Sequence, residues 1–325
     1  MRVTVSATAL LGLSQHAFAW GAIGHRTVAY LAYNYLSIDT RGYLNEILHN
    51  VSPYDVSDAA VWPDEIRRSR PYTAGWHFID AHDNPPHQCS VSYPADCHNE
   101  NSYSNNTCII SAIFNQTSLF INPSTPSVTR TEALRFILHF LGDIHQPLHS
   151  EDAFRGGNDI KVCFGHECEG KGATNLHSVW DREILHKIVG LVEEPANLTE
   201  QRSVAKKWAD GLYSRALAGE YDYDVSAIVL AGQCTEYSHP YKCSLEWVRE
   251  SNAYVCSYAM QPGLSWLKSN DLSLTYYDGA KPIVEKQISM AGVRLAAWLE
   301  AIVKAAKEET TKIAWDYYQQ RPLFN

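Results

Sequence analysis

The stretch LRFILHFLGDIHQPLH, residues 134–149, is the part of the sequence that decides the predicted fold. Its apolar residues recur at three- and four-residue steps, which predicts an amphipathic helix: Leu134, Ile137, Leu138 and Leu141. His139 and Asp143 stand four residues apart and therefore lie one turn above each other. Pro147 ends the helix, and His149 follows it closely.

An imidazole and a carboxylate one turn apart, with a further nitrogen donor just past the helix end, can converge on a divalent metal ion such as zinc. A single His/Asp pair also arises by chance on the polar face of an ordinary helix. Taken alone, the pair leaves both interpretations equally open. The segment NLHSVWD, residues 175–181, repeats the arrangement with His177 and Asp181, and this repetition favours a metal site.

Three other segments carry further candidate ligands. WGAIGH begins at Trp20 and holds His25, DAAVWPDE holds Asp64, and WHFIDAHDNPP holds His77. Pro63 predicts a short helix that starts at the WPD motif, with proline in its first turn. Alternating apolar residues around His77 predict an extended segment. Each candidate also has an ordinary interpretation by itself, as part of a flexible terminus or as a buried, hydrogen-bonded histidine.

The candidates outnumber the ligands that one zinc ion can use. Zinc is usually four-coordinate, and catalytic sites keep one position open for water, so two or three ions fit the count. The candidate ligands are Trp20, His25, Asp64, His77, His139, Asp143, His149, His177 and Asp181.

Composition and the lack of a linker predict one domain, and the periodicity of most of its segments predicts helices. The chain has 325 residues, of which 45% are hydrophobic and 19% charged, and no linker-like stretch divides it. IKVCF, residues 160–164, predicts the one credible β-hairpin, closed by a short cysteine loop. Further helices are predicted at residues 27–36, 109–121, 203–219, 244–260 and 288–309.

Residues 1–19 have the features of a secretory signal peptide. Arg2 precedes a short apolar run, and Ala17-Phe18-Ala19 fits a cleavage site that would make Trp20 the first residue. No later stretch is long and apolar enough to span a membrane. We therefore predict a secreted, extracellular protein that is monomeric and does not engage membranes. Removing Arg2 with the signal takes the net charge from −9 to −10.

Because secreted proteins fold in an oxidising compartment, we predict that the eight cysteines form four disulfides. Connectivity does not follow from sequence in general, but proximity in the sequence favours two local pairs, Cys163–Cys168 and Cys234–Cys243. Cys97–Cys108 is a plausible third pair, which leaves Cys89 to pair with Cys256. Four sequons suit a glycoprotein surface: Asn50, Asn105, Asn115 and Asn197. The acidic charge and the lack of a basic stripe exclude a conventional duplex-DNA-binding module.

The ordered motifs WGAIGH, WPD, HFIDAHDNPP, HFLGDIHQPLH, GGND and NLHSVWD resemble those of the secreted fungal and plant single-strand-specific zinc nucleases. These are the nucleases of the S1/P1 type, which include the 3′-nucleotidases. The resemblance covers Trp20 to about Ile302. It predicts a nuclease domain over residues 20–303 and a C-terminal extension of unassigned function over 304–325.

The resemblance implies a mainly helical fold, related to zinc phospholipase C, that holds three Zn²⁺ ions in a cleft. The first ion would be bound by Asp64, His77, His139 and Asp143. The second would be bound by His149, His177 and Asp181. The third would be bound by the amino nitrogen and carbonyl oxygen of Trp20, with His25 and Asp143. Asp143 would therefore bridge two ions, and the Trp20 amine would exist only after signal cleavage.

The resemblance also implies the reaction and the substrate contacts. A hydroxide held between two zinc ions would attack phosphorus, break the P–O3′ bond of single-stranded DNA or RNA and leave 5′-phosphates. 3′-Nucleotides would be substrates too. Asp64, Asp143 and Arg67 would be catalytic, with Arg67 also holding phosphate. Phe78 would stack on a base, Asp80 would contact the base edge and Asn158 would line the same site. Without the resemblance, Phe78 would be predicted to pack in the core and Asp80 and Asn158 to form turns.

Two alternative functions are compatible with a zinc-binding secreted protein. A zinc phospholipase C would act on phospholipid headgroups. Asp181 in place of glutamate, the HFIDAHDNPP segment, the cysteines and the sequons argue against it. A non-catalytic zinc-binding secreted protein is disfavoured because every ligand position is occupied.

Overall fold

The computed structural model describes residues 20–49, 55–98, 107–165, 168, 174–229 and 240–319. In the first half of the chain, the helices are α1 (Ala22–Tyr35), α2 (Ile38–His49), α3 (Val56–Ile66), the 3₁₀ helix η1 (Pro71–Trp76), α4 (Ile109–Ile121) and α5 (Ser127–Asp143).

The second half begins with the 3₁₀ helix η2 (Pro147–Ser150) and a small hairpin, β1 (Lys161–Val162) and β2 (Thr174–Asn175). Then follow α6 (Leu176–Ser178), the π-helical turn η4 (Val179–Glu183), α7 (Ile184–Val189), α8 (Leu198–Leu217), α9 (Val225–Val229), α10 (Pro240–Tyr254), the π-helical turn η5 (Val255–Ala259), α11 (Leu264–Ser269) and α12 (Thr275–Gln319).

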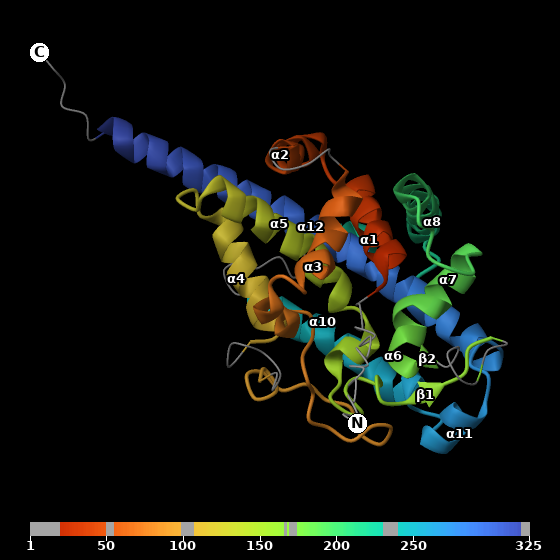
Figure 1. Cartoon of the computed structure of the whole chain (residues 1–325). Coiled ribbons are helices and arrows are strands. Elements are labelled where there is room, and N and C mark those ends of the chain that lie inside the picture. The colour runs from red at the N-terminus through yellow and green to blue at the C-terminus, as the bar shows by residue number, and fades with distance from the viewer. Residues whose placement is uncertain are drawn as a thin grey trace, which may run out of the picture.

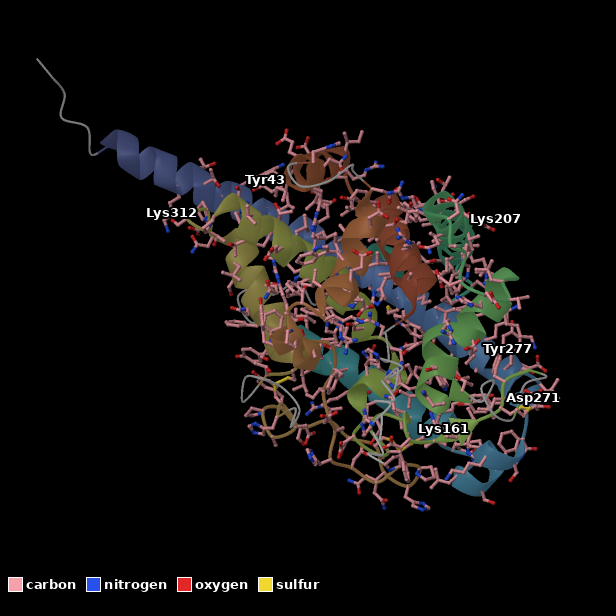
Figure 2. All side chains as sticks on the ribbon, in the orientation of Figure 1. Tyr43, Lys161, Lys207, Asp271, Tyr277 and Lys312 are labelled. Carbon is pink, nitrogen blue, oxygen red and sulfur yellow. A yellow bond between two sulfur atoms is a disulfide. The ribbon has the colours of Figure 1, made fainter. Side chains whose placement is uncertain are left out.

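Helix α12 forms the long axis of the molecule. It crosses the whole molecule in Figure 1, and its C-terminal end projects beyond the other helices. Helix α1 packs against both α8 and α12, while α4 packs against α5. Figure 2 shows the side chains that fill the space between these helices. The buried apolar ones form one large core, which includes Trp180, Trp247 and Trp298. The mainly helical fold predicted from the sequence is confirmed.

Helix α5 lies inside this core, and every residue from Ala133 to Asp143 is buried. The apolar side chains of Leu134 and Leu138 pack as the periodicity predicts. His139 and Asp143 are on the same helix and are also fully buried. Because water cannot reach these polar groups, other parts of the protein or a bound ion must satisfy them.

Two helix boundaries differ from the sequence prediction. Helix α5 ends at Asp143, so Pro147 begins η2 and His149 sits in that 3₁₀ turn. Pro63 lies inside α3, near its C-terminal end, so the prediction that a helix starts there is wrong. The N-cap is Asp55, whose carboxylate accepts a hydrogen bond from the Ser57 amide at 2.8 Å. The capping residue, rather than the proline, sets the start of the helix.

The predicted hairpin is present as an antiparallel pair with Lys161 opposite Asn175 and Val162 opposite Thr174. Three of the expected disulfides occur in the structure: Cys89–Cys256, Cys97–Cys108 and Cys163–Cys168. Cys243 is also disulfide-bonded, while Cys234 lies outside the described residues.

Of the four sequons, Asn115 and Asn197 are exposed, whereas Asn50 and Asn105 lie outside the described residues. Within the described part of the chain, no helix is both long and apolar enough to cross a membrane.

The carboxyl groups of Glu151, which is buried, and Asp83, which is partly buried, lie close together and connect the segment after η2 with the segment after His77. The Ala153 amide donates to Glu151 Oε1 at 2.8 Å. Asn252 donates to Asp83 and to the Ser150 carbonyl, at 3.4 and 2.9 Å. Burial, together with the neighbouring Asp83 carboxyl, raises the pKa of Glu151 from 4.5 to about 8.

We expect Glu151→Gln to stabilise the protein at pH 8 and to change its stability little at pH 4. The pKa of Glu151 is higher in the folded than in the unfolded chain, so folding stability falls as pH rises from about 4.5 to about 8. Glutamine cannot ionise and escapes this loss. Thermal unfolding at both pH values, at fixed zinc concentration, measures the effect. Exposed Glu46→Gln is the control, and an equal shift at both pH values would contradict the prediction.

Candidate metal centre

The nine candidate ligands come from distant parts of the chain, and the folding of the helices brings them to one region. They lie just before α1 (Trp20), in α1 (His25), in α3 (Asp64), after η1 (His77), in α5 (His139 and Asp143), in η2 (His149), in α6 (His177) and in η4 (Asp181). Eight of them are buried, and the side chain of Asp64 is 10% exposed. A partly exposed Asp64 puts the group at the edge of solvent.

Asp143 is the centre of the first group. Its Oδ2 lies 3.0 Å from His77 Nδ1 and 3.2 Å from His139 Nε2, and these two nitrogens are 3.0 Å apart. Its other oxygen, Oδ1, lies 3.1 Å from His25 Nε2. One carboxylate therefore faces two imidazoles on one side and a third on the other.

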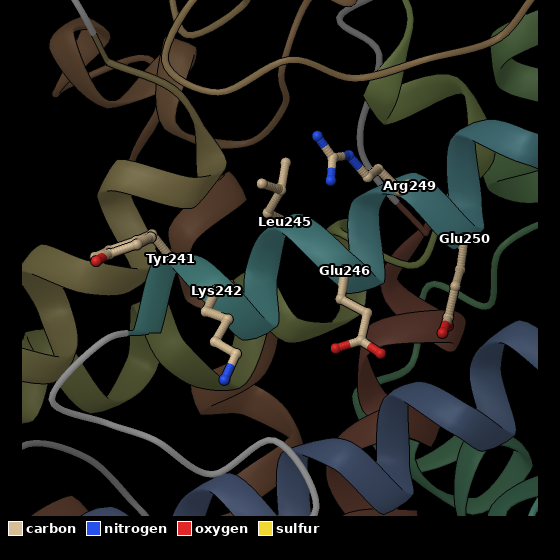
Figure 3. Close-up of a pocket in the computed structure, with 6 residues that line it drawn as sticks. All are labelled: Tyr241, Lys242, Leu245, Glu246, Arg249 and Glu250. Atoms are coloured by element: carbon tan, nitrogen blue, oxygen red, sulfur yellow. The ribbon is translucent and has the colours of Figure 1, made fainter.

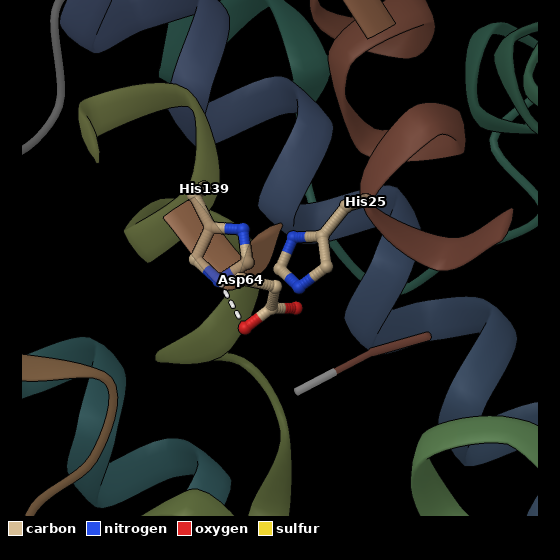
Figure 4. Close-up of side chains that lie close together, drawn as sticks. All are labelled: His25, Asp64 and His139. Carbon is tan, nitrogen blue, oxygen red and sulfur yellow. Dashed lines mark ion pairs between the residues drawn. The ribbon is translucent and has the colours of Figure 1, made fainter. Parts of the chain in front are cut away.

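Asp64 completes this group from α3. Its Oδ1 lies 3.6 Å from His139 Nε2 and 3.8 Å from His77 Nδ1. Figure 4 shows Asp64, His25 and His139 brought together by three different helices. The His25 and His139 rings are stacked, with centroids 3.8 Å apart.

His149, His177 and Asp181 form the second group. His177 Nε2 lies 3.2 Å from His149 Nε2 and 3.2 Å from Asp181 Oδ2, and His149 Nε2 lies 3.9 Å from Asp181 Oδ1. The side chains of His177 and Asp181 still face each other although Asp181 lies in a π-helical turn. Such turns are frequent at functional sites.

Backbone carbonyls decide which nitrogen of these rings can bind a metal. The Nδ1 atoms of His139, His149 and His177 donate to the carbonyls of Ala60, His77 and Gly156 at 2.7, 2.8 and 2.7 Å. Because a carbonyl only accepts, each Nδ1 carries the hydrogen and each neutral ring keeps a lone pair on Nε2. The two Nε2 atoms of the second group then face each other with no hydrogen between them. A cation between them relieves this repulsion.

Burial sets the charge states of the histidines. It lowers the pKa of His77 to about 4 and also lowers the pKa of His25 and His149. For His139, burial acts downward too, but the carboxylates of Asp143 and Asp64 outweigh it and raise the pKa.

The pKa of Asp143 is lowered instead. Burial alone would raise its pKa, yet the surrounding imidazoles, His139 first, hold the pKa well below its ordinary value. Ionised carboxylates beside mainly neutral imidazoles are the forms that bind zinc.

Among the described residues, several buried polar atoms of the site form no hydrogen bond of good geometry, even where a candidate ligand lies within 3.2 Å. They are His25 Nδ1 and Nε2, His77 Nε2, Asp143 Oδ1 and Asp181 Oδ2. A buried polar atom left in this way costs about 1–3 kcal/mol. Ligands about 2.0–2.1 Å from a tetrahedral zinc ion lie roughly 3.3 Å from one another, close to the contacts of 3.0–3.2 Å seen here. Donor types, tautomers and spacing all fit zinc.

A further carboxylate and sulfur group does not fit. Asp83, Glu151 and Cys89 lie close together, but the Cys89 sulfur is bonded to Cys256 and offers no thiolate.

Trp20 is fully buried in the core beside α5. The amide of the next residue, Gly21, donates to the Asp181 carbonyl at 2.7 Å. The indole lies close to Gly24 and Gly142. Trp20 is thereby held beside the residue that precedes Asp143.

The expected substrate residues flank the ligands. Ile79 is buried, whereas Phe78 and Asp80 on either side of it are partly exposed, as an extended segment requires. Asn158 donates to the Arg155 carbonyl at 2.8 Å and so forms part of the turn. Arg67 Nη1 lies 3.5 Å from Asp64 Oδ1. The four residues are near the ligands in sequence or space, and their substrate roles stay predictions.

Gln146 is a residue of the site that the sequence prediction missed. Its Nε2 donates to Asp181 Oδ1 at 2.6 Å, and its Oε1 accepts from the Leu148 amide at 2.5 Å. The side chain orients a ligand of the second group and caps the turn that carries His149. Its place between the candidate ligands Asp143 and His149 was the available signal.

A cavity of about 1030 Å³ opens onto Asp64 and Asp181, and Gly21 and Arg67 also line it. Another of about 630 Å³ runs along one side of α10 (Figure 3). All six residues that line the second cavity come from α10, and the nine candidate ligands are not among them. Of these two cavities, the one beside Asp64 reaches the candidate metal centre.

We expect Gly142→Ala to destabilise the protein and to lower its zinc content. An added Cβ would lie 2.9 Å from His25 Nδ1, and the His25 ring is also stacked on the His139 ring. Overpacking costs about 1–3 kcal/mol, which outweighs the gain of about 1 kcal/mol from alanine in a helix. Chemical unfolding and zinc analysis measure both effects.

Gly211→Ala in α8 is the matched control, because nothing lies within 4 Å of its added Cβ. It should gain stability and keep its zinc. A Gly142→Ala protein that behaved like this control would show that His25 does not need the space.

Comparison with known proteins gives a consistent result. The family model described as S1/P1 Nuclease matches residues 20–304. The chain is 36% identical over 307 residues to Nuclease S1 of Aspergillus oryzae, covering 93% of this chain and 98% of that protein. It is 36% identical over 285 residues to Nuclease P1 of Penicillium citrinum, covering 87% and 97%. It is 31% identical over 301 residues to Endonuclease 4 of Arabidopsis thaliana, covering 90% and 92%.

Proposed function

Because the chain belongs to the S1/P1 nuclease family, we propose that it is a secreted endonuclease that uses three zinc ions to hydrolyse single-stranded DNA and RNA to 5′-phosphonucleotides. It would also remove phosphate from 3′-nucleotides. The family itself makes the chain a nuclease, a hydrolase of phosphodiester bonds, and zinc-dependent. The number of ions, the role of each residue and secretion are parts of the proposal.

The observation that carries the proposal is the position of the Asp143 carboxylate between two sets of imidazoles. His77 and His139 face one oxygen and His25 faces the other, all within 3.2 Å. A carboxylate with both oxygens directed at separate nitrogen donors suits a ligand shared by two ions.

Each ion would have its own set of ligands. Asp64, His77, His139 and Asp143 would hold the first, and His149, His177 and Asp181 the second. Trp20, through its amine and carbonyl, would hold the third together with His25 and Asp143. When bound, zinc lowers the pKa of a coordinated water to about 7 and offsets the negative charge of the phosphate oxygens.

The chain's own residues prepare the site for this chemistry. The carbonyls of Ala60, His77 and Gly156 hold three imidazoles in the tautomer whose Nε2 binds metal. Gln146 holds Asp181 in place. Arg67, on the wall of the cavity beside Asp64, can hold a phosphate oxygen through its guanidinium.

The preference for single strands would come from the recessed position of the ligands. Asp143 and the histidines around it are buried, so the phosphorus must enter the cavity, which a stacked duplex cannot do without unpairing. Phe78 would compensate by stacking on the freed base, with Asp80 at the base edge and Asn158 beside them. Stacking of this kind is worth about 1–3 kcal/mol per base and accepts any base.

Secretion would be needed for the disulfides and for the third ion. Three disulfides are typical of an oxidising compartment. Cleavage after Ala19 would turn the Trp20 amide nitrogen into an amine that can bind zinc. We further propose that the mature protein acts as a monomer.

We expect Asp143→Ala to reduce hydrolysis of single-stranded DNA by at least about a thousandfold, because one substitution removes a ligand from two ions. Zinc analysis should show fewer than three ions per chain, the number expected for the mature wild type. Asp222→Ala, which changes a carboxylate whose side chain is 76% exposed, is the control. An active variant that still binds three ions would refute the bridging role.

We expect a protein with extra residues before Trp20 to lose most of its activity, because an amide nitrogen cannot replace the amine as a ligand. The comparison is with the mature protein beginning at Trp20, and with one carrying the same extra residues after Asn325. Zinc content and rate of DNA hydrolysis are the measurements. Full activity of the N-terminally extended form would show that the terminal amine is dispensable.

A further inference from the structure

The cavity beside the metal ligands extends away from the residues expected to hold the base. Parts of α1, α3, η1, η4 and the start of α8 form its walls, and Asp64 and Asp181 place it against both ligand groups. Phe78, Asp80 and Asn158 do not line it. The candidate metal centre therefore borders two regions, one at Phe78 and one in this cavity.

Four arginines line the cavity, and two of them are already engaged in the protein. Arg26 is 2% exposed and donates to Asp58 and Ser57 at 2.6 and 2.8 Å. Arg67 lies against Asp64. These two guanidiniums support the wall and the ligand group.

The other two, Arg68 and Arg182, are placed to bind a ligand. Arg68 is exposed, and it forms no ion pair within the described part of the chain. The side chain of Arg182 is 53% exposed, and among the described residues its ion pair is to the adjacent Glu183 at 2.5 Å. Exposed pairs of this kind contribute little and can be exchanged for a phosphate.

These two arginines approach from different elements. Arg68 follows α3 and comes directly after Arg67, whereas Arg182 lies in η4 directly after the ligand Asp181. The Cβ and Cγ atoms of Arg182 lie beside Gly21, 3.8 Å from the position that a Cβ on Gly21 would occupy. The two charges thus border the cavity on two walls, each one residue from a residue of the proposed site.

The other charges that face the cavity do not cancel this pair. Glu194 is bound to His186 at 2.8 Å, and Asp64 and Asp181 are assigned to metal. Glu65 is the remaining carboxylate in the lining. Apolar groups complete the walls, contributed by Val61, Pro71, Ala74 and Leu198. The volume is at the top of the range of about 300–1,000 Å³ for small-ligand sites, which leaves room for a nucleotide.

We propose that this cavity binds the nucleotide on the far side of the cleaved phosphate from the base at Phe78, with Arg68 and Arg182 holding its phosphate backbone. A polynucleotide continues in both directions from the phosphate that is cleaved. The base on one side would lie at Phe78, and the cavity offers the nucleotide on the other side a path lined by arginines. A 3′-mononucleotide has no nucleotide on that side and does not reach these arginines. The inference rests on the proposed function and adds a preference for strands over mononucleotides.

The test compares the mature zinc-loaded protein with the double variant Arg68→Gln/Arg182→Gln on a single-stranded oligothymidylate and on thymidine 3′-monophosphate. We expect kcat/KM for the oligonucleotide to fall about tenfold and that for the mononucleotide to stay unchanged. The slope of log kcat/KM against log salt for the oligonucleotide should become shallower by about 1.4, roughly 0.7 for each lost phosphate contact.

The control, Lys207→Gln/Lys268→Gln, removes two positive charges from exposed positions that do not line the cavity. An Arg68→Gln/Arg182→Gln protein that matched this control would overturn the inference. An equal loss on both substrates would overturn it as well, because the arginines would then act on the cleaved phosphate itself.

Binding of a phosphorothioate single strand, followed by fluorescence anisotropy, separates this inference from the proposed function. A wild type that hydrolyses neither substrate refutes the proposed function. If it still binds the strand about tenfold more tightly than the double variant does, the cavity assignment stands. Equal binding refutes the assignment.

Discussion

The burial of one ionised carboxylate, that of Asp143, is the constraint on which the rest of the structure depends. Asp143 is fully buried on a helix that is itself inside the core. An isolated charge there would be very costly, so nitrogen donors or cations must surround it. Helix α1 brings His25, the segment after η1 brings His77, and α5 itself brings His139. The packing of α1 and α3 around α5 is therefore tied to the same interaction that makes a metal site.

Backbone groups complete the arrangement. Carbonyls of Ala60, His77 and Gly156 each take the hydrogen of an imidazole Nδ1. Gly156 has a φ of +58°, and an added Cβ would lie 2.6 Å from the Leu148 carbonyl, so this turn requires glycine. The candidate ligands supply the donor atoms, and backbone carbonyls of other segments decide which nitrogen of each imidazole is available. The fold is thus part of the chemistry of the site.

The site joins an acidic protein to a polyanionic substrate. The chain carries a net charge of −9, and the positive charge for phosphate would come from metal ions and a few arginines at the cavity. Positive charge at the cavity directs a strand to the ligands without a basic surface that tracks a duplex. Phe78 and the cavity with Arg68 and Arg182 lie at separate borders of the ligand groups, which suits a chain that passes through the site.

Local sequence determined which side chains could act together. Four-residue spacing placed His139 with Asp143 and His177 with Asp181, since helix geometry repeats every 3.6 residues. The mainly helical fold also followed from periodicity. Other features depended on the arrangement of distant segments: the close approach of His25 to Gly142, the hold of Gln146 on Asp181, and the position of Arg68 and Arg182 on two walls of one cavity. Local patterns carry no information about such contacts, because the packing of α1, α3 and η4 around α5 decides them.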